Sequence, residues 1–178
     1  MTCSDSEAIQ RVNAGDIEAF AVLVDRYHDR LTRYANHLLQ NRADAEEVVQ
    51  DTFVRAFRAL PRYEEREQLS AWLLRILVNR CRTVAAKRRV FEPLEAADYE
   101  FDPGEDVADR LAVRDELARA MAQLPDDQRE ALALRFGEDL SFDEMAALTG
   151  AGVSALKMRV KRAVDRLRML MEGTRAAV

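Results

Sequence analysis

Cysteine and histidine, the side chains that build disulfides and most zinc sites, are scarce in this sequence. Its 178 residues include only Cys3, Cys81, His28 and His37, with no CxxC pair and no further ligands spaced to complete a metal site. Structural zinc sites need four cysteine or histidine ligands at short, regular spacings. We therefore expect two free thiols, a reducing compartment, no metal site and no cofactor.

Glycine, proline and long apolar runs are also sparse. The chain has six glycines and four prolines, and few runs of β-branched residues, which together indicate an all-α fold. No run approaches the ~20 apolar residues of a membrane span, and the first residues lack the basic and apolar regions of a signal peptide. We expect a cytoplasmic protein with no membrane insertion.

Acidic and basic residues are unevenly distributed along the chain, whose net charge is −5. Residues 1–90 carry 15 basic and 13 acidic residues, residues 91–115 carry 2 and 9, and residues 116–178 carry 10 of each. Pro93, Pro103 and Gly104 oppose regular structure in the acidic part. The sequence predicts two small helical domains, 1–90 and 111–178, joined by an acidic flexible linker, 91–110. Judged by composition alone, such a segment is usually a solvating spacer.

The stretch 141–168 has the pattern of two helices joined by a tight turn. Ser141 and Glu144 form an S-x-x-E capping box at the start of the first helix, and Gly150 and Gly152 interrupt the pattern after it. Apolar residues then recur every three or four positions and give the second helix one apolar face. These residues are Leu156, Val160, Ala163, Val164 and Leu167.

The opposite face of this second helix is polar and basic, and it consists of Ser154, Lys157, Met158, Lys161 and Arg162. A basic helix held across another by a glycine turn is typical of the helix-turn-helix that enters a DNA major groove. An ordinary helical hairpin with a solvated basic face has the same pattern.

Residues 1–90 predict four helices. The capping residues assigned from the sequence are Asp5 and Ser6 for the first, Asp16 for the second, Asp44 with Glu47 for the third, and Ser70 for the fourth. The third helix should direct Val48, Val49, Phe53, Ala56, Phe57 and Leu60 inward, and Glu46, Gln50, Asp51, Arg55 and Arg58 outward. Its carboxylates are more typical of a solvated face than of an acid–base pair, so we expect no catalytic residues.

The fourth predicted helix, which starts near residue 70, is apolar on one side and basic on the other. We expect Trp72, Leu73, Ile76, Leu77 and Cys81 to pack inward, and Arg75, Asn79, Arg80, Arg82, Lys87, Arg88 and Arg89 to form the polar side. Cations at its end suit both nucleic acid and the helix dipole. Trp72 suits either a core position or stacking on an unpaired base.

Four segments together resemble the extracytoplasmic-function (ECF) sigma factors of the bacterial sigma-70 family. They are 16–27 (DIEAFAVLVDRY), 44–57 (DAEEVVQDTFVRAF), 71–82 (AWLLRILVNRCR) and 124–168, which begins LPDDQREALALRF. They occur in the family's order and spacing across almost the whole chain. The resemblance implies a protein without enzymatic activity that binds core RNA polymerase, directs it to promoters and helps to melt the DNA.

The resemblance also implies residue roles. Gln50, Asp51, Phe53, Arg55 and Arg58 match the helix that docks on the clamp of the polymerase's largest subunit. The part that reads the minus-ten element is matched by the helix carrying Trp72, Arg75, Asn79, Arg80, Lys87 and Arg88. In this match Asn79 corresponds to a base-reading asparagine, Arg75 and Arg80 are placed to hold phosphates, and the loop 62–69 forms a pocket for a flipped base. Lys157, Met158, Lys161 and Arg162 match base-facing positions that read the minus-thirty-five element.

Two positions depart from the family pattern, Gly152 where serine is usual and Ser154 where glycine is frequent. Glycine caps a helix nearly as well as serine, so we expect the recognition helix to form. Met158 stands where a small polar residue is common, which predicts an apolar contact such as a thymine methyl.

The resemblance implies two further partners, the flap of the second-largest polymerase subunit and an anti-sigma factor. It also implies that the acidic linker enters the polymerase's active-site cleft. The alternative is an autonomous helix-turn-helix regulator that does not join polymerase. Such a regulator needs a dimer interface or ligand pocket in its first domain.

Overall fold

Apolar residues at three- and four-residue spacing run through most of the chain, and these segments are helices in the structure. The computed structural model describes residues 3–64, 68–91 and 108–176, and every regular element in these ranges is helical. The chain divides into two compact units, Met1–Glu92 (unit 1) and Pro93–Val178 (unit 2). An all-α fold with two small helical domains is therefore confirmed. Most of the predicted acidic linker and part of the loop 62–69 lie outside the described residues.

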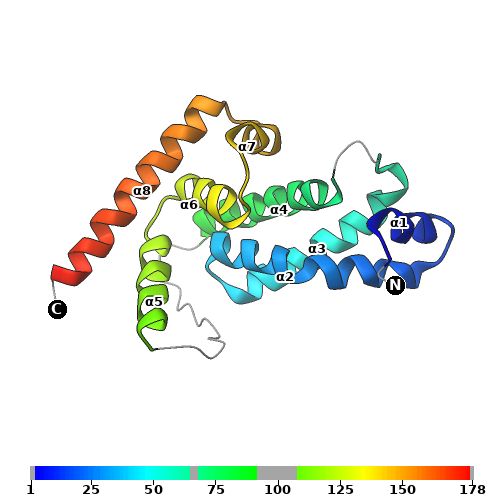
Figure 1. Ribbon diagram of the computed structural model, residues 1–178, viewed down its shortest axis with the longest axis horizontal. Coiled ribbons are helices and arrows are strands. Elements are labelled where there is room, and N and C mark those ends of the chain that lie inside the picture. Colours follow the sequence, from blue (N-terminus) through cyan, green and yellow to red (C-terminus); the bar gives the residue numbers. More distant parts are fainter. Residues whose placement is uncertain (1–2, 65–67, 92–107, 177–178) are drawn as a thin grey trace. The chain divides into compact units, whose positions relative to one another are not determined.

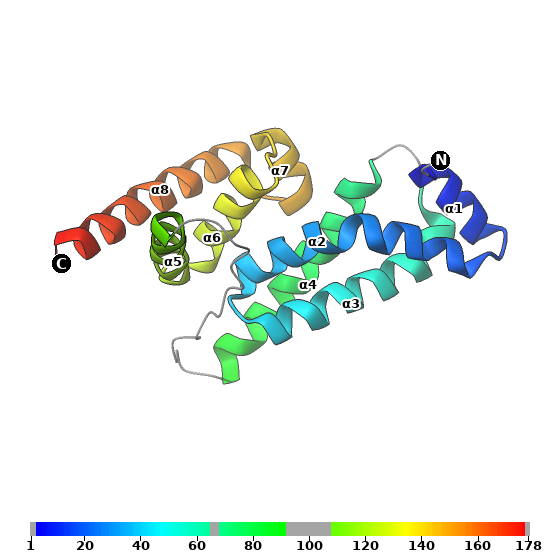
Figure 2. The same ribbon diagram turned by 60° about the horizontal axis from the view of Figure 1, so that its bottom comes forward.

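Unit 1 is built around three helices that lie side by side, α2 (Phe20–Leu39), α3 (Arg42–Ala59) and α4 (Leu69–Phe91) (Figure 1, Figure 2). Their facing stripes bury Leu23, Leu31, Tyr34, Val48, Val49, Ala56, Leu73, Leu77 and Cys81. Burying one leucine or valine side chain contributes roughly 1.5–3 kcal/mol. Leu74 and Val78 are also buried, although the predicted inward set omitted them. They are needed because α4 packs against both α2 and α3 and so buries a wider stripe.

The turn between α2 and α3 determines where α3 begins. Gln40 adopts a left-handed conformation (φ 52°), and its side-chain amide donates to the His37 carbonyl at 2.8 Å. Asn41 then caps α3, because its Oδ1 accepts from the Asp44 amide at 2.9 Å. Our prediction that Asp44 caps this helix with Glu47 was wrong. Asp44 lies in the first turn, where its charge suits the helix N-terminus.

The first helix, α1 (Asp5–Asn13), is capped by Ser4 and not by Asp5 and Ser6 as predicted. Ser4 and Glu7 form a reciprocal capping box, with the Glu7 amide donating to Ser4 Oγ at 3.2 Å and the Ser4 amide donating to Glu7 at 2.7 Å. This leaves the Asp5 carboxylate available for long-range contacts.

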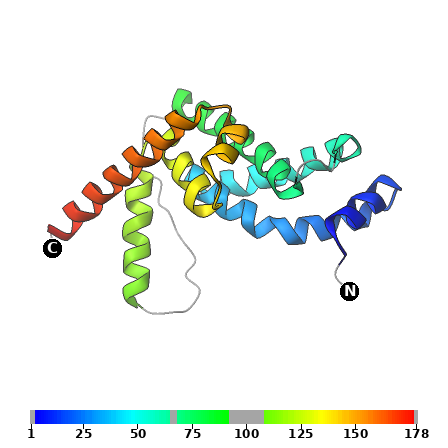
Figure 3. The same cartoon turned by 45° about the horizontal axis from the view of Figure 1, so that its top comes forward.

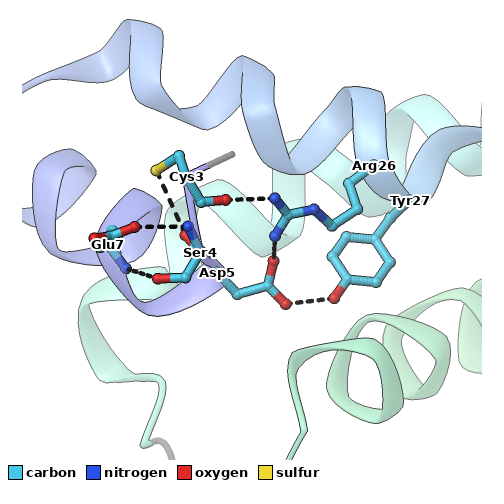
Figure 4. A network of polar contacts seen from close by, with 6 residues as sticks. All are labelled: Cys3, Ser4, Asp5, Glu7, Arg26 and Tyr27. Atoms are coloured by element: carbon cyan, nitrogen blue, oxygen red, sulfur yellow. Dashed lines mark hydrogen bonds and ion pairs between the residues drawn. The ribbon is translucent and has the colours of Figure 1, made fainter. Parts of the chain in front are cut away.

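Asp5 and its neighbours attach α1 to α2 (Figure 4). Tyr27 Oη donates to Asp5 Oδ2 at 2.5 Å, and the Arg26 guanidinium contacts both Asp5 and the Cys3 carbonyl. Burial and the bond to Asp5 raise the pKa of the Tyr27 hydroxyl. The tyrosine therefore remains a donor, and α1 stays attached to α2 through contacts that the sequence pattern did not show.

A short 3₁₀ turn, Ile17–Ala19, leads into α2, and Asp16 caps it by accepting from the Ala19 amide at 3.3 Å. We predicted that Asp16 caps the long second helix, but α2 begins at Phe20 without a side-chain cap, and Asp16 caps only the 3₁₀ turn before it. A second 3₁₀ turn, Leu60–Arg62, follows α3 at Pro61. Ser70 does not cap α4, contrary to our prediction. The helix begins at Leu69, and the Ala71 and Trp72 amides already donate to the Gln68 carbonyl, at 3.0 and 3.1 Å.

Unit 2 contains α5 (Ala108–Ala122), α6 (Asp126–Leu132), α7 (Phe142–Thr149) and the long α8 (Val153–Ala176) (Figure 3). All three shorter helices contact either α8 or the π-helical turn that follows α6. The buried Arg129 donates to Leu124 O at 3.2 Å and to Asp126 Oδ1 at 2.6 Å, which secures the start of α6. Arg159 of α8 pairs with Asp127 of α6 at 3.4 Å.

The connection from α6 to α7 differs from the one we expected. The apolar residues Ala131, Leu132 and Leu134 predict one helix over 126–136, with Gly137 as its C-cap. The α-helix instead ends at Leu132, a π-helical turn spans Ala133–Gly137, and Asp139 takes the left-handed conformation (φ 53°). Arg135 Nη1 donates to the Leu140 carbonyl at 2.7 Å, which satisfies a carbonyl that the turn leaves free of helical partners.

Candidate nucleic-acid interface

The turn between α7 and α8 positions the predicted recognition helix. Both bonds of the Ser141 capping box are present, with the Glu144 amide donating to Ser141 Oγ at 3.2 Å and the Ser141 amide donating to the Glu144 carboxylate at 2.7 Å. Gly150 ends α7 in the left-handed conformation (φ 72°), in which a side chain would be strained. Gly152 then accepts the first α8 bond, from Leu156, at 3.0 Å. The predicted helix-turn-helix geometry is confirmed.

The α8 helix has one buried and one exposed face, as its periodicity predicted. Leu156, Val160 and Ala163 are buried against the rest of unit 2. All five predicted upstream-element residues are exposed, namely Ser154, Lys157, Met158, Lys161 and Arg162. We refer to these five residues as the α8 face. Three cations beside an exposed methionine can contact both phosphates and base edges.

Phe142, which the sequence analysis did not select, lies beneath two of the cations of unit 2. Lys157 Nζ is 5.7 Å from the centroid of its ring, and Arg135 Cζ is 5.4 Å from it. Cations within ~6 Å of an aromatic centroid are attracted to the ring face. No signal in the sequence links these residues, because the π-helical turn and the α7–α8 turn bring them together.

On α4, the predicted minus-ten residues differ in exposure. Asn79 and Lys87 are exposed, whereas Trp72 and Arg75 are half-buried. The Trp72 ring lies against Tyr63, with centroids 5.0 Å apart and planes tilted by 52°. Trp72 is therefore neither a plain core residue nor a free platform, and Tyr63 is an aromatic neighbour that the sequence analysis missed.

Arg80 of α4 is joined to α3 by an ion pair with Asp51. Asp51 Oδ2 also accepts from Arg55 Nε at 2.9 Å. Partial burial works against ionisation of Asp51, but the bond from Arg55 and the charge of Arg80 hold the pKa of this carboxyl below its usual value. Asp51 therefore bridges the predicted polymerase-binding helix and the predicted DNA-binding helix.

Arg88 has a structural role that its assignment to the basic DNA-binding side did not anticipate. Its Nη1 donates to the Leu39 carbonyl at 3.2 Å and pairs with Asp44 at 3.3 Å. Both partners lie at the α2–α3 turn, so Arg88 holds the end of α4 against that turn. Arg88 therefore has a structural role within unit 1, and its contact with DNA stays a prediction.

On α3, four of the five predicted polymerase-binding residues reach the surface. Gln50, Arg55 and Arg58 are exposed and Asp51 is half-buried. Phe53 is buried, with 7% of its surface exposed, and its ring packs beside Phe20 and His28, so its assignment as a contact residue is corrected to a packing role.

Val54 is an exposed apolar residue on this helix that the sequence analysis missed. It lies four residues after Gln50 and four before Arg58, so these three side chains share one stripe of α3. Apolar residues ringed by polar ones are frequent at the centre of protein interfaces.

The described part of the chain offers no other obvious chemistry. Within it, no group of three or more His, Cys, Asp or Glu side chains is arranged to hold a metal ion. Neither Cys3 nor Cys81 takes part in a disulfide, and Cys81 is buried. None of the described helices is long and apolar enough to cross a bilayer.

Comparison with known proteins places both units in one family. Residues 23–90 match the family described as Sigma-70 region 2, and residues 114–167 match the family described as Sigma-70, region 4. The chain is 31% identical over 172 residues to the RNA polymerase sigma-H factor of Pseudomonas aeruginosa, across 89% of each protein. It is also 31% identical over 173 residues to the ECF RNA polymerase sigma-E factor of Escherichia coli strain K12, across 90% of each. The chain belongs to the ECF sigma factors.

Solved structures agree with this assignment. The sigma factor resembles the structure of CnrH in complex with the cytosolic domain of CnrY, with a TM-score of 0.67 and 29% identity over 93% of this chain and 96% of that one. It also resembles the sigma factor RpoE in complex with the anti-sigma factor NepR from Bartonella quintana, with a TM-score of 0.74 and 27% identity over 86% and 96%. As a sigma factor, the protein acts with RNA polymerase in promoter-specific transcription initiation. Sigma factors are DNA-binding initiation factors and not enzymes.

Proposed function

We propose that this sigma factor divides promoter recognition between its two units, with α4 of unit 1 binding the minus-ten element and α8 of unit 2 binding the minus-thirty-five element. The observation that carries the proposal is the pair of exposed, cation-bearing helical faces on two separate units. A protein with two contacts on one duplex gains affinity through the linkage of the two binding events.

In unit 2, the α8 face reads the upstream element. Its exposed cations, Lys157, Lys161 and Arg162, supply phosphate contacts and hydrogen bonds to base edges. Met158 is 47% exposed and suits an apolar contact with a thymine methyl group.

In unit 1, α4 captures the melted strand. Asn79 is exposed and carries both hydrogen-bond donors and acceptors, as base recognition requires. The half-buried Trp72, backed by Tyr63, supplies an aromatic surface for an unstacked base. Holding an extruded base offsets the few kcal/mol needed to unstack it, so that binding favours melting.

The polymerase contact uses the α3 stripe of Gln50, Val54 and Arg58, with Arg55 and Asp51 beside it. A polar, charged surface around one exposed valine suits docking on the clamp of the largest subunit.

The flap of the second-largest subunit is the expected partner of unit 2. We further propose an anti-sigma partner, because the similar CnrH structure holds CnrY and the similar RpoE structure holds the anti-sigma factor NepR.

The deciding experiment combines co-purification of the full chain with core RNA polymerase and run-off transcription on a library of genomic fragments. The expected result is a stoichiometric complex, with transcripts from a limited set of promoters that share two sequence elements. Specific DNA binding by the chain alone, without association with core polymerase, would instead identify an autonomous regulator and overturn the proposal. A second pull-down from cells under stress and non-stress conditions tests for the anti-sigma partner.

A further inference from the structure

Asp51 occupies an unusual position, because it belongs to α3 and yet its closest charged neighbours lie on two helices. Its Oδ2 atom accepts from Arg55 Nε on the same helix at 2.9 Å. The same oxygen pairs with Arg80 Nε on α4. One carboxylate oxygen therefore holds two guanidinium groups, one from the predicted polymerase-binding helix and one from the predicted DNA-binding helix.

The ion pair holds the Arg80 side chain beside α3. Its Nε atom is inaccessible to solvent and forms an ion pair with Asp51 that does not have hydrogen-bond geometry, while 26% of the side chain remains exposed. A guanidinium carries five N–H donors, so a contact through Nε leaves donors for a second acceptor. An arginine held in this way loses less conformational freedom when it binds a phosphate than an arginine that moves freely.

The charge of the cluster also suits a phosphate. Asp51 is one negative charge between two positive ones, and its lowered pKa keeps it ionised at neutral pH. The cluster thus keeps a net positive charge, and Asp51 orders Arg80 without cancelling the attraction for DNA. Asn79, the predicted base-reading residue, precedes Arg80 on α4 and is exposed.

We propose that Asp51 is a positioning residue for promoter DNA, which holds the Arg80 guanidinium from α3 in the orientation that binds a backbone phosphate of the minus-ten element. The proposal rests on the function proposed above and adds a second role to a residue predicted only to contact polymerase. It also gives a physical link between the two surfaces of unit 1, because a single carboxylate is shared between them.

The test measures how holoenzyme binding to DNA depends on salt. The DNA is a fork junction with a single-stranded minus-ten segment, taken from a promoter found in the run-off experiment, and sigma factor is added to saturate core polymerase. The binding constant K falls as salt rises, and each phosphate contact adds about 0.7–0.9 to the magnitude of the slope of log K against log salt concentration. We refer to this magnitude as the slope. Arg80→Ala should lower the slope by about this amount, Asp51→Asn should lower it equally, and the double variant should lower it no further.

Two variants separate positioning from a general structural effect. Asp51→Glu keeps the carboxylate and should restore the wild-type slope. Glu46→Gln breaks another exposed ion pair of α3, Arg42 with Glu46 at 3.0 Å, and should leave the slope unchanged. A weaker but correctly folded unit 1 would alter the amount of sigma needed for saturation and not the slope of the saturated complex.

Three outcomes would overturn the inference while leaving the proposed function intact. The first is a slope unchanged by Arg80→Ala, which would mean that Arg80 binds no phosphate. The second is a slope lowered by Arg80→Ala but not by Asp51→Asn. The third is a slope raised by Asp51→Asn, which would mean that Asp51 masks Arg80. If the wild-type chain does not form a holoenzyme that binds the fork junction, the proposed function itself fails and the inference fails with it.

Discussion

The two units present their basic residues in different ways. On α8, Lys161 and Arg162 extend from an exposed face that points away from the core of unit 2. On α4, Arg80 and Arg88 are paired with Asp51 and Asp44, both from α3. The comparison shows that a basic stripe in a sequence does not reveal which of its cations pair with carboxylates in the folded protein. Helical periodicity separates exposed from buried positions, but it does not show which cations pair with carboxylates of another helix.

The largest expected effect tests the α8 face. Arg162→Ala should weaken binding to the minus-thirty-five element by ~1–3 kcal/mol if the guanidinium reads a base, and should leave unit 2 as stable as before because the side chain is exposed. Footprinting of holoenzyme on a promoter and thermal unfolding of the free chain measure the two effects. Arg166→Ala, an exposed arginine one turn further along α8, is the matched control. An unchanged footprint for Arg162→Ala would remove it from the recognition set.

An effect of similar size is expected at the point where the duplex opens. Asn79→Ala should reduce promoter opening by ~1–3 kcal/mol, because a base-reading amide is lost from an exposed position of α4. Permanganate reactivity of thymines reports the opening. The loss should be larger on duplex promoters than on pre-melted ones, since the latter need no unstacking. Trp72→Ala should likewise reduce opening more on duplex promoters than on pre-melted ones. Equal losses on both templates would indicate a folding defect instead of lost base capture.

A smaller effect should distinguish the paired arginine Arg88 from its neighbour. Arg88→Ala should destabilise unit 1 by about 1 kcal/mol, since it removes a bond to the Leu39 carbonyl and an ion pair with Asp44. Lys87→Ala, its exposed neighbour, should have no effect on stability. Trp72 is the single tryptophan of the chain, so its fluorescence during urea unfolding reports on unit 1 alone. Equal stability of the two variants would contradict the structural role of Arg88.

Removing the aromatic support of the α8 face should have a modest effect. Phe142→Leu keeps an apolar side chain but loses the attraction for Lys157, and should weaken upstream-element binding by about 0.5–1 kcal/mol. Holoenzyme titrations on promoters with and without this element measure the difference. In a Lys157→Ala background, Phe142→Leu should cost less, because the interaction has already been removed. Additive losses would show that Phe142 acts independently of Lys157.

The smallest effect concerns pH. The pKa of Asp51 is below its ordinary value of 3.8, so its pairing stabilises unit 1 above that value and the stabilisation is lost as pH falls through the lower, folded-state pKa. Wild type should be more stable than Asp51→Asn by about 0.2–1 kcal/mol near neutral pH, and this difference should disappear in strong acid. Urea unfolding followed by Trp72 fluorescence checks it. A difference that does not change with pH would show that the pairing contributes nothing through charge.

Much of unit 2 could be predicted because its signals are local. A capping box acts over three residues, and the turn at Gly150 requires a left-handed conformation that glycine adopts without strain. The alternation of Leu156, Val160 and Ala163 with basic residues reports the buried and exposed faces of one helix. The predictions failed where several residues qualify for one role. Ser4, Asp5 and Ser6 are all good capping residues. The sequence does not show that the Asp5 side chain instead accepts hydrogen bonds from Arg26 and Tyr27 of α2.

The α3 helix shows a different limit of sequence reasoning. The family pattern assigned Phe53 to the polymerase contact, whereas its helical position assigned it to the core, and the structure supports the core. Val54 was missed for the opposite reason. It is an apolar residue at an outward position of the helix. Periodicity indicates only that such a residue does not fit the apolar stripe, and it does not indicate that the residue forms part of a binding surface.

The sequence by itself determined the helical class, the two-unit organisation, the α7–α8 turn and the exposure of the five residues of the α8 face, because helix periodicity and capping depend on residues close together in the chain. The tertiary structure alone decided which cations are engaged and by what. Asp51 and Arg80 are 29 positions apart, as their numbers show, and Asp44 and Arg88 are further apart still. Such pairs form only when α3 and α4 pack side by side, since an ion pair requires atoms within a few ångströms and no local pattern encodes that approach.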